Sequence, residues 1–275
     1  MNAVPDSRKI AAAFHQQSSQ YDQNIAVQKR VVANLIRQIR AGAGRPPGRI
    51  LDVGSGTGSL LARLHSIYPE ATLCGVDLAY NMCQRTSEKL GQGTLVVNAA
   101  AENLPFADGV FDLVVSTSAL QWVADLERAL GEMRRVLKPG GTLEVAFFCE
   151  GTLVELQRCF CEALATRGQE QSRQSARLHT FQSVADLKSI LAGMDFEKIV
   201  LTCESETDWY DDLQSLLRSI RSIGAGTVAG GSGGGLGWRG ILNEASRRYR
   251  EYYGENGRIP VTYKVLYLQA ELSGS

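Results

Sequence analysis

The middle of the chain alternates between short apolar runs and segments that repeat apolar residues at helical spacing. Five runs have the length of a buried strand, and they cover 50–54, 72–77, 94–99, 111–117 and 142–148. The clearest helix follows the fourth run, with Leu126, Leu130, Met133 and Leu137 on one side, and Lys138-Pro-Gly-Gly is expected to end it. This alternation predicts an α/β fold built on a parallel, doubly wound sheet.

Two helices are predicted before this core. Asp6 or Ser7 can cap the first of them. Its apolar line is Ile10, Phe14 and Tyr21. The apolar line of the second is Val27, Val31, Leu35 and Ile39. The segment 42–48, GAGRPPG, breaks the pattern and is interpreted as a linker.

Behind the fifth run the pattern is less regular. We expect a helix at 153–165, a polar loop at 166–180, a helix that Ser183 and Asp186 cap and that runs to Met194, and a sixth strand at 198–203. An insertion follows, with a helix whose apolar face is Trp209, Leu213, Leu216, Ile220 and Ile223. A loop at 224–240 with nine glycines, a helix at 238–253 and a last strand at 261–271 complete the chain.

These elements divide the chain into four parts. Residues 1–48 are N-terminal helices that contribute to a lid, and 49–207 form the core. Residues 208–258 are a helical insertion that completes the lid with its glycine-rich loop, and 259–275 return to the core as its last strand. We expect the lid to cover the strand ends, because ligands bind there in such sheets.

The composition narrows the class of protein. The chain has 275 residues, of which 44% are hydrophobic, so it can bury a sizeable core. Its 29 basic and 29 acidic side chains balance, which argues against a nucleic-acid-binding face spread over the protein. We expect no membrane association, because the N-terminus lacks the apolar core of a signal peptide and no run approaches membrane-spanning length.

Cysteine and histidine argue against a metal site. The six cysteines contain no C-x-x-C pair, and the three histidines, at 15, 65 and 179, are scattered. We interpret the cysteines as reduced residues of a cytoplasmic protein, and we expect a monomer.

The strongest chemical signal is the stretch RILDVGSGTG at 49–58. Glycines let the backbone take positive φ and let a ligand approach, and the helix that follows offers unpaired N–H groups to a carboxylate or phosphate. Asp52 stands two residues before the first glycine. Asp77 ends the next strand, 19 residues after Gly58, where an acid can accept hydrogen bonds from both hydroxyls of a ribose.

Together with FDLVVS at 111–116 and RVLKPGG at 135–141, these segments resemble the class I S-adenosylmethionine-dependent methyltransferases. The resemblance implies a seven-stranded, mostly parallel, Rossmann-like sheet whose last strand is antiparallel to the others. It also implies S-adenosylmethionine as the cofactor, bound by the core at 49–207.

The candidate cofactor residues follow the parts of that molecule. Its amino-acid end would lie against Asp52, Gly54, Ser55, Gly56 and Gly58, and its ribose against Asp77. Its adenine would lie against Leu78, Met82 and the backbone of Ala101 and Glu102. Structural roles compete with these: Asp52 can serve the turn, Asp77 can cap a helix, and Leu78 and Met82 can be core. The segment at 100–106 is similar to the family's D-x-E-x-L-P-F, with Ala100 in place of the aspartate that contacts the adenine amino group.

The fourth strand ends with Ser116, Thr117 and Ser118, beside the expected methyl sulfonium, and Gln121 and Trp122 follow. An aromatic face near the sulfonium is favourable by roughly 1–2 kcal/mol in a dry site. Packing under the lid is an equally weighted role for Trp122. No residue set indicates covalent catalysis, and none of the histidines is expected to face the sulfonium. This favours an acceptor that is already ionised, such as a carboxylate with a pKa of about 4.

Segments along the rest of the chain are similar to the malonyl-acyl-carrier-protein O-methyltransferases of biotin synthesis. They are IAAAFHQQSSQYDQNIAVQ at 10–28, LQWVADLERALGEMRRVLKPGG at 120–141, GTLVEL at 151–156, LRSIRSIGA at 217–225 and RIPVTYKVLY at 258–267. The resemblance implies that the free carboxylate of a malonyl thioester, on the carrier protein or on coenzyme A, becomes a methyl ester that primes pimeloyl synthesis. The acceptor-pocket candidates are Tyr21, Gln121, Trp122 and Phe181, although Tyr21 can also simply end an apolar helix face.

An acyl carrier protein is acidic and should meet a basic patch. Arg218 and Arg221 lie three residues apart on the insertion helix, and Arg247, Arg248 and Arg250 lie on the next. Charge pattern alone favours solvated helix faces, and the family resemblance makes the partner interpretation competitive.

Other functions stay open from the sequence. One is an O-methyltransferase of a free small carboxylic acid such as trans-aconitate, whose family also has a Leu-Gln-Trp-Val segment. Another is a non-catalytic S-adenosylmethionine-binding protein, which Ala100 keeps under consideration. Methylation of a quinone carbon is less favoured because its acceptors need more help with a proton, and the G-x-G-x-G spacing disfavours a nicotinamide dehydrogenase.

Overall fold

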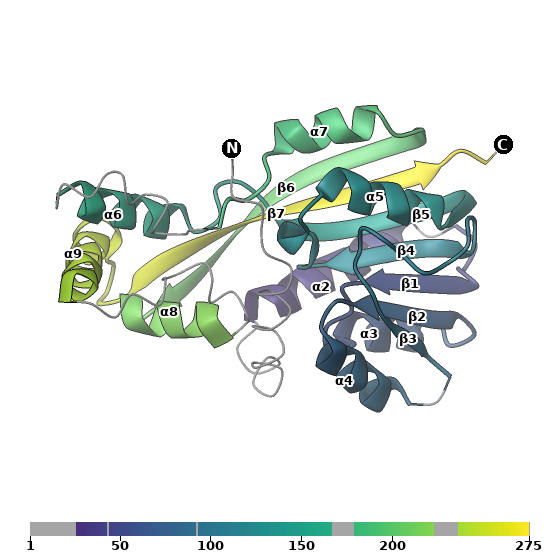
Figure 1. The fold of residues 1–275 in the computed structure, drawn as a ribbon, viewed down its shortest axis with the longest axis horizontal. Helices are drawn as coiled ribbons and strands as arrows, with labels where there is room; N and C mark the ends of the chain where they lie inside the picture. Colours follow the sequence, from purple (N-terminus) through teal and green to yellow (C-terminus); the bar gives the residue numbers. More distant parts are fainter. Residues whose placement is uncertain (1–25, 43, 92, 167–178, 223–235, 275) are drawn as a thin grey trace.

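A seven-stranded sheet with the order β3-β2-β1-β4-β5-β7-β6 forms the centre of the computed structural model, which describes residues 26–42, 44–91, 93–166, 179–222 and 236–274 (Figure 1). The strands are β1 Arg49–Val53, β2 Thr72–Asp77, β3 Leu95–Asn98, β4 Phe111–Thr117, β5 Leu137–Phe148, β6 Phe196–Tyr210 and β7 Ile259–Leu272. Strands β1 to β5 are parallel, and β7 runs antiparallel to β5 and β6. The α/β class, the mostly parallel sheet and the antiparallel last strand are therefore confirmed.

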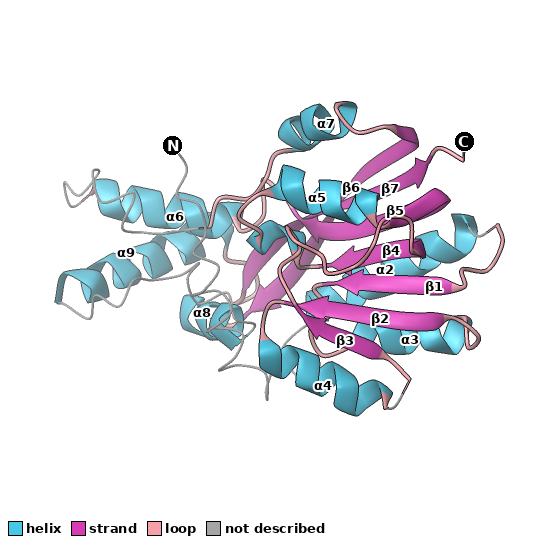
Figure 2. Cartoon of the chain, turned by 45° about the vertical axis from the view of Figure 1, so that its right-hand side comes forward, coloured by secondary structure: helices cyan, strands magenta, loops and turns pink. Residues whose placement is uncertain are grey.

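Helices cover both faces of this sheet (Figure 2). They are α2 Ala26–Gly42, α3 Ser59–Ile67, α4 Tyr80–Leu90, η2 Leu120–Trp122, α5 Leu126–Arg135, α6 Val154–Ala165, α7 Val184–Ala192, α8 Leu213–Ser222 and α9 Leu236–Tyr253. The buried side chains of α2 and α3 belong to one core cluster, and those of α5 and α7 belong to a second on the opposite face. Strands β1, β2 and β4 are thus buried on both faces, which explains why their sequences are largely apolar.

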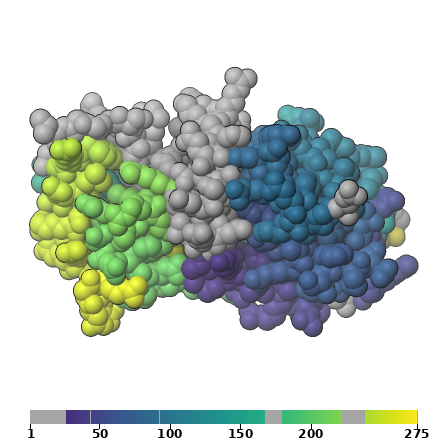
Figure 3. Space-filling view, turned by 90° about the horizontal axis from the view of Figure 1, so that it is seen from below, coloured from purple at the N-terminus to yellow at the C-terminus, as the bar shows by residue number. Residues whose placement is uncertain are grey.

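The paired strands β6 and β7 continue beyond the other strands, as far as the pair Tyr210 and Ile259 (Figure 1). Helices α6, α8 and α9 gather at this extended end, and they enclose a core that includes Phe160, Leu216 and Tyr249, each at most 2% exposed. Figure 3 shows α8 and α9 at one end of an elongated molecule and the elements around α3 and α4 at the other. Helix α6, which the sequence placed in the core, is part of this helical group.

The bounds of several predicted elements differ from those in the fold. Strand β6 is much longer than the predicted 198–203, and Trp209 lies in it rather than in the insertion helix. Strand β6 lies at the edge of the sheet and has many polar side chains, so its apolar pattern was too weak to predict its full length. Arg30 of α2 pairs with two of these side chains, Glu206 and Asp208, at 2.7 Å each. Leu137 begins β5 opposite Phe111 instead of ending α5.

The placement of α2 also differs from the expectation of a lid. Its buried face, which includes Val31 and Leu35, packs against α3 and the sheet rather than over the strand ends. The predicted capping of α7 is confirmed, since the backbone N–H of Asp186 donates to Ser183 Oγ at 3.0 Å. The predicted first helix and most of the loops at 166–180 and 224–240 lie outside the described residues.

Candidate functional site

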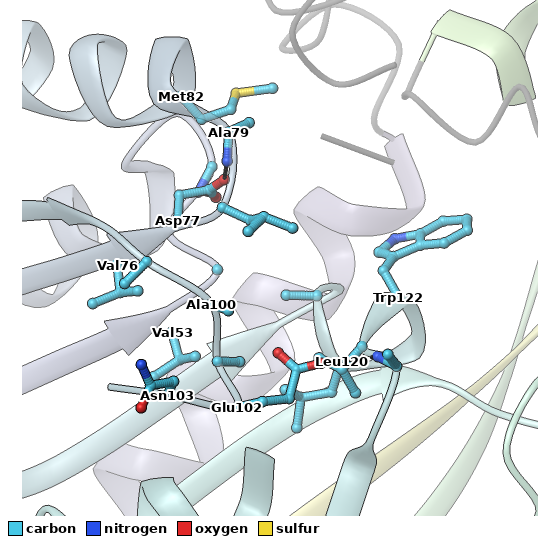
Figure 4. Close-up of a pocket in the computed structure, with 18 of the residues that line it drawn as sticks. Val53, Val76, Asp77, Ala79, Met82, Ala100, Glu102, Asn103, Leu120 and Trp122 are labelled. Atoms are coloured by element: carbon cyan, nitrogen blue, oxygen red, sulfur yellow. Dashed lines mark hydrogen bonds between the residues drawn. The ribbon is translucent and has the colours of Figure 1, made fainter. Parts of the chain in front are cut away.

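A cavity of about 460 Å³ lies at the carboxyl ends of β1, β2 and β4. The strand order reverses between β1 and β4, which is the position where open α/β sheets bind ligands. Figure 4 shows Asp77 and Met82 on one side of the cavity, Trp122 opposite them, and Glu102 and Leu120 between. The volume lies within the range of roughly 300–1,000 Å³ that small-molecule sites occupy.

The turn after β1 forms one wall of the cavity. Gly54, Gly56 and Gly58 all have positive φ, at 77°, 55° and 75°, so each takes a conformation that side chains disfavour. The backbone N–H groups of Gly54 and Ser55 donate to the Val76 carbonyl at 2.7 and 2.9 Å, which ties the turn to β2. Gly54 and Gly56 line the cavity.

A Cβ atom would have a different effect at each of the two lining glycines. At Gly54 it would lie 2.2 Å from the Ala119 Cβ, so the turn packs directly against the segment after β4. At Gly56 it would meet nothing within 4 Å, so this backbone borders open space in the cavity. A ligand can therefore approach the main chain at Gly56.

Asp77, at the end of β2, connects the glycine turn to the start of α4. Its Oδ2 accepts from the Gly56 N–H at 2.9 Å, and its Oδ1 accepts from the Ala79 N–H at 2.8 Å. Burial raises the pKa of Asp77, and these two donors oppose the rise. The carboxylate therefore orders the glycine turn and the entry to α4 while it faces the cavity.

Asp52 is a buried acid behind the turn, with 1% of its surface exposed. Its Oδ1 has no hydrogen-bond partner among the described residues, and the same holds for the buried Ser55 Oγ. Burial, with a smaller contribution from the charge of Asp77, raises the pKa of Asp52 to about 8. Neither Asp52 nor Ser55 lines the cavity, and both stand directly behind the residues that do.

The protonation of Asp52 should make stability depend on pH. Because its pKa is higher in the folded protein than in the unfolded chain, the free energy of unfolding should fall as pH rises from about 4 to about 8, by at most about 1.4 kcal/mol per unit. Asp52→Asn removes this dependence, so the variant should gain stability relative to the wild type between about pH 5 and about pH 8. Urea unfolding of the ligand-free proteins at both pH values measures the difference, and parallel curves for the two proteins would contradict the assignment.

The segment after β3 closes a second side of the cavity. Residues 99–103 all line it, and so do Leu78, which follows β2, and Met82 of α4. Glu102 is held in place because its Oε1 accepts from the Ala124 N–H at 2.9 Å and its carbonyl accepts from Arg128 Nε at 2.9 Å. Leu78 is 40% exposed and Met82 is 2% exposed, so Leu78 can cover a ligand while Met82 belongs to the wall.

The end of β4 supplies the third side. Thr117 and Ser118 line the cavity, and Ser118 has a φ of 53°, which is unusual for a residue with a side chain. Ser116 does not line it, because its buried hydroxyl donates to the Val53 carbonyl at 2.7 Å and joins β4 to β1. Gln121 is 7% exposed and lies behind the lining, and its Nε2 donates to the Ser118 carbonyl at 2.8 Å.

Trp122 lines the cavity and leads to an aromatic group that the sequence did not indicate. Its ring centroid lies 4.7 Å from the ring of His179, which in turn lies 4.8 Å from that of Phe181. The structure thus brings Gln121, Trp122 and Phe181 together around His179. His179 does not line the cavity itself but stacks against Trp122, which does, and sequence reasoning had not singled it out. The one sequence signal for His179 is its position two residues before the predicted pocket residue Phe181.

The remaining predicted residues lie elsewhere. Arg218 and Arg221 are exposed on α8, away from the residues that line the cavity. Tyr21 lies outside the described residues, and so does any contact that it makes. Gly58 begins α3 as its N-cap and does not line the cavity.

The described residues contain neither a metal-binding cluster nor a membrane-spanning helix. No group of three or more His, Cys, Asp or Glu side chains could hold a metal ion there. None of the helices described is both long and apolar enough to cross a membrane.

The chain is similar to known proteins over nearly its whole length. Residues 51–145 match the family model described as a methyltransferase domain. A malonyl-[acyl-carrier protein] O-methyltransferase of Geobacter sulfurreducens is 41% identical over 95% of the chain and 97% of that protein. A protein of the same name from Methylovorus is 32% identical over 95% of the chain and 88% of that protein.

A solved structure has the same fold. The YcgJ protein from Bacillus subtilis matches 88% of the chain and 99% of its own length, with a TM-score of 0.59 and 20% sequence identity.

Proposed function

Since the chain belongs to the malonyl-[acyl-carrier protein] O-methyltransferases, within the class I S-adenosylmethionine-dependent methyltransferases, we propose that it methylates the free carboxylate of malonyl-acyl carrier protein. The cofactor is S-adenosylmethionine, and the product is a methyl ester that primes pimeloyl synthesis for biotin. The observation that carries this proposal is the 41% identity to a protein of that name over 97% of its length.

The cavity fits a nucleoside that carries a charged amino-acid tail. The open space at Gly56 admits the tail next to the main chain of the turn, and the carboxylate of Asp77 lies where ribose hydroxyls can donate to it. The unpaired Oδ1 of Asp52 places a latent negative charge behind the turn, and the positive charges of the cofactor would favour its ionised form. Leu78, Met82 and the backbone of 101–102 form the wall against which the adenine would lie.

The bound cofactor supplies a methyl group that is already activated on a sulfonium. The residues of this chain then have to orient the acceptor and exclude water. Trp122 offers an aromatic face to the positive charge at one end of the cavity. No general base is needed for a carboxylate, which is ionised at neutral pH.

Transfer of a labelled methyl group tests the function directly. Malonyl-acyl carrier protein, malonyl-coenzyme A and free trans-aconitate would be offered in parallel with labelled S-adenosylmethionine. Label on the malonyl thioesters that is lost after mild ester hydrolysis is the expected result. Label on the free acid alone would overturn the malonyl assignment, and cofactor binding without any transfer would favour a non-catalytic protein.

We assign the carrier-protein contact to Arg218 and Arg221 of α8. Both are exposed and make no salt bridge within the described part of the chain. On α9, in contrast, Arg247 and Arg248 both pair with Glu244, so their charges are largely used within the protein. Two free positive charges on one helix suit an acidic partner.

Reversing these charges should affect the carrier-bound substrate selectively. For Arg218→Glu/Arg221→Glu we expect the KM for malonyl-acyl carrier protein to rise roughly tenfold or more, with the KM values for malonyl-coenzyme A and S-adenosylmethionine unchanged. Arg63→Glu is the control. Arg63 is exposed on α3, and α3 lies at the end of the molecule opposite α8 (Figure 3). Equal kinetics of the double variant and the wild type on the carrier substrate would remove this contact from consideration.

A further inference from the structure

The imidazole of His179 is held between two aromatic side chains at the Trp122 end of the cavity. Its centroid lies 4.7 Å from Trp122, with the rings tilted by 45°, and 4.8 Å from Phe181, with the rings nearly perpendicular at 81°. Trp122 belongs to η2, whereas His179 and Phe181 belong to the segment before α7. Two segments far apart in sequence therefore fix the orientation of this ring.

One nitrogen of His179 is committed and the other is free. The ring makes a hydrogen bond to the backbone of Gln121, which raises its pKa, while burial lowers it more strongly. Nε2 is buried and has no partner among the described residues, so Nδ1 makes the bond. A buried polar atom without a partner is costly, and such atoms are commonly kept for a ligand.

Two further unsatisfied polar atoms belong to the segment after β4, whose Gln121 backbone holds the His179 ring. Ser118 Oγ and Gln121 Oε1 are also buried and have no partner among the described residues. Ser118 lines the cavity, and its positive φ of 53° marks a strained backbone at this point. Gln121 and His179 do not line the cavity themselves, and the His179 ring adjoins it through its contact with Trp122.

The rest of the cavity is poorly suited to a carboxylate. Its acidic lining residues are Asp77, Glu102 and Asp125. Its basic lining residue in the described chain is Arg128, whose Nε donates to the Glu102 carbonyl, so one positive charge stands against three acidic residues. Burial and the Gln121 backbone account for the shift of the His179 pKa, so no charged group of the described residues acts on this ring.

We propose that His179 binds the malonyl carboxylate by taking up a proton at Nε2 and donating it in a hydrogen bond to one carboxylate oxygen. This rests on the proposed function, because it assumes a carboxylate acceptor. The second carboxylate oxygen forms the new bond to the methyl carbon, the methyl–sulfur bond breaks, and its electron pair stays on sulfur. The ester has no charge, so the imidazolium loses its partner and returns the proton to solvent, which favours product release.

Binding of the acceptor should therefore take up protons. Calorimetry would follow malonyl-coenzyme A binding to the wild-type enzyme saturated with S-adenosylhomocysteine, at about pH 7 in two buffers of different ionisation enthalpy. We expect the wild type to take up a large part of one proton, because an entering carboxylate raises the pKa of a neutral imidazole. Binding without proton uptake would overturn the proposal, whatever the variants show.

His179→Gln keeps a polar side chain but cannot carry the charge. Its KM for malonyl-acyl carrier protein should rise roughly 10- to 100-fold, the range for losing one charge-assisted hydrogen bond, with the KM for S-adenosylmethionine unchanged. It should also lose the proton uptake. His65→Gln is the matched control, because His65 is exposed on α3 and outside the cavity.

The outcomes separate this proposal from the proposed function. A wild-type enzyme that methylates malonyl thioesters, together with a His179→Gln variant of unchanged KM and proton uptake, refutes the role of His179 alone. A wild type that does not methylate malonyl thioesters refutes the function itself. If His179→Gln no longer binds S-adenosylmethionine, His179→Asn and the wild-type calorimetry decide.

Discussion

Replacing Asp77 by asparagine is expected to weaken S-adenosylmethionine binding by roughly 100-fold or more. The carboxylate accepts the N–H groups of Gly56 and Ala79 and still faces the cavity, so it acts on the protein and on the ligand. An asparagine has a single acceptor oxygen, and its NH2 group would meet one of the two N–H donors. Each charge-assisted bond lost is worth roughly 1.5–3 kcal/mol, and two of them give the expected factor.

Titration calorimetry with S-adenosylmethionine measures this effect, and Asp112→Asn supplies its control. Asp112 Oδ2 also accepts two backbone N–H groups, those of Gly48 and Arg49 at 3.0 and 2.7 Å, but it lies at the opposite end of β4. This variant should lose stability and keep its affinity for the cofactor. Similar cofactor affinities for the Asp77 and Asp112 variants would show that Asp77 has only a structural role.

Gly54→Ala should lower the free energy of unfolding by about 2–4 kcal/mol. The fraction of molecules that is folded and able to bind the cofactor should fall accordingly. The added Cβ would lie 2.2 Å from the Ala119 Cβ, and the φ of 77° adds backbone strain. The turn cannot move away freely, because the Gly54 and Ser55 N–H groups are bound to the Val76 carbonyl. Urea unfolding measures the loss, with S-adenosylmethionine affinity as a second readout on folded protein.

Two further variants separate the steric clash from the strain. Gly257→Ala has the same φ of 77° and nothing within 4 Å of its Cβ, so it should cost only the strain, about 1–2 kcal/mol. Ala119→Gly removes the opposing methyl group, so it should restore part of the stability lost in Gly54→Ala. Additive effects of Gly54→Ala and Ala119→Gly would mean that the two positions are not in contact.

Most of the core could be predicted because its signals are local. Strands β2 and β4 have the predicted bounds, and β1 and β3 differ from prediction by one residue at each end. Strands β1, β2 and β4 are buried on both faces, so their residues are apolar in a continuous run and the pattern is unambiguous, whereas β3 is a partly exposed edge strand. The glycine turn is equally local, since a positive φ is required at Gly54, Gly56 and Gly58 themselves.

Much of the cavity could also be predicted, for a topological reason. Gly54, Gly56, Asp77, Leu78 and Met82 line it. Each ends a strand of the parallel sheet or lies in the turn or the first helical turn after one, and the carboxyl ends of neighbouring strands meet at one edge. Knowing the strand ends was therefore enough to bring these residues together without knowing the packing.

The sequence alone could not separate lining residues from those behind them. Asp52, Ser116 and Gln121 are close in sequence to cavity residues but are buried behind the wall, where Ser116 bonds to the Val53 carbonyl. A period of two along a strand fixes the face of a side chain, but the residues at a strand end leave that regular geometry. The side-chain direction there depends on the neighbouring strand.

By itself, then, the sequence determined the α/β class, the strand ends and the glycine turn, because backbone conformation and apolar periodicity are properties of neighbouring residues. Tertiary structure alone decided three further things: the long β6, stabilised by Arg30 of α2; the pairing of Arg247 and Arg248 with Glu244, while Arg218 makes no salt bridge with another described residue; and the contact of His179 with Trp122. Two of these contacts join segments that lie far apart along the chain. The third depends on which of several possible charged partners the packing brings within reach, and no local pattern encodes that choice.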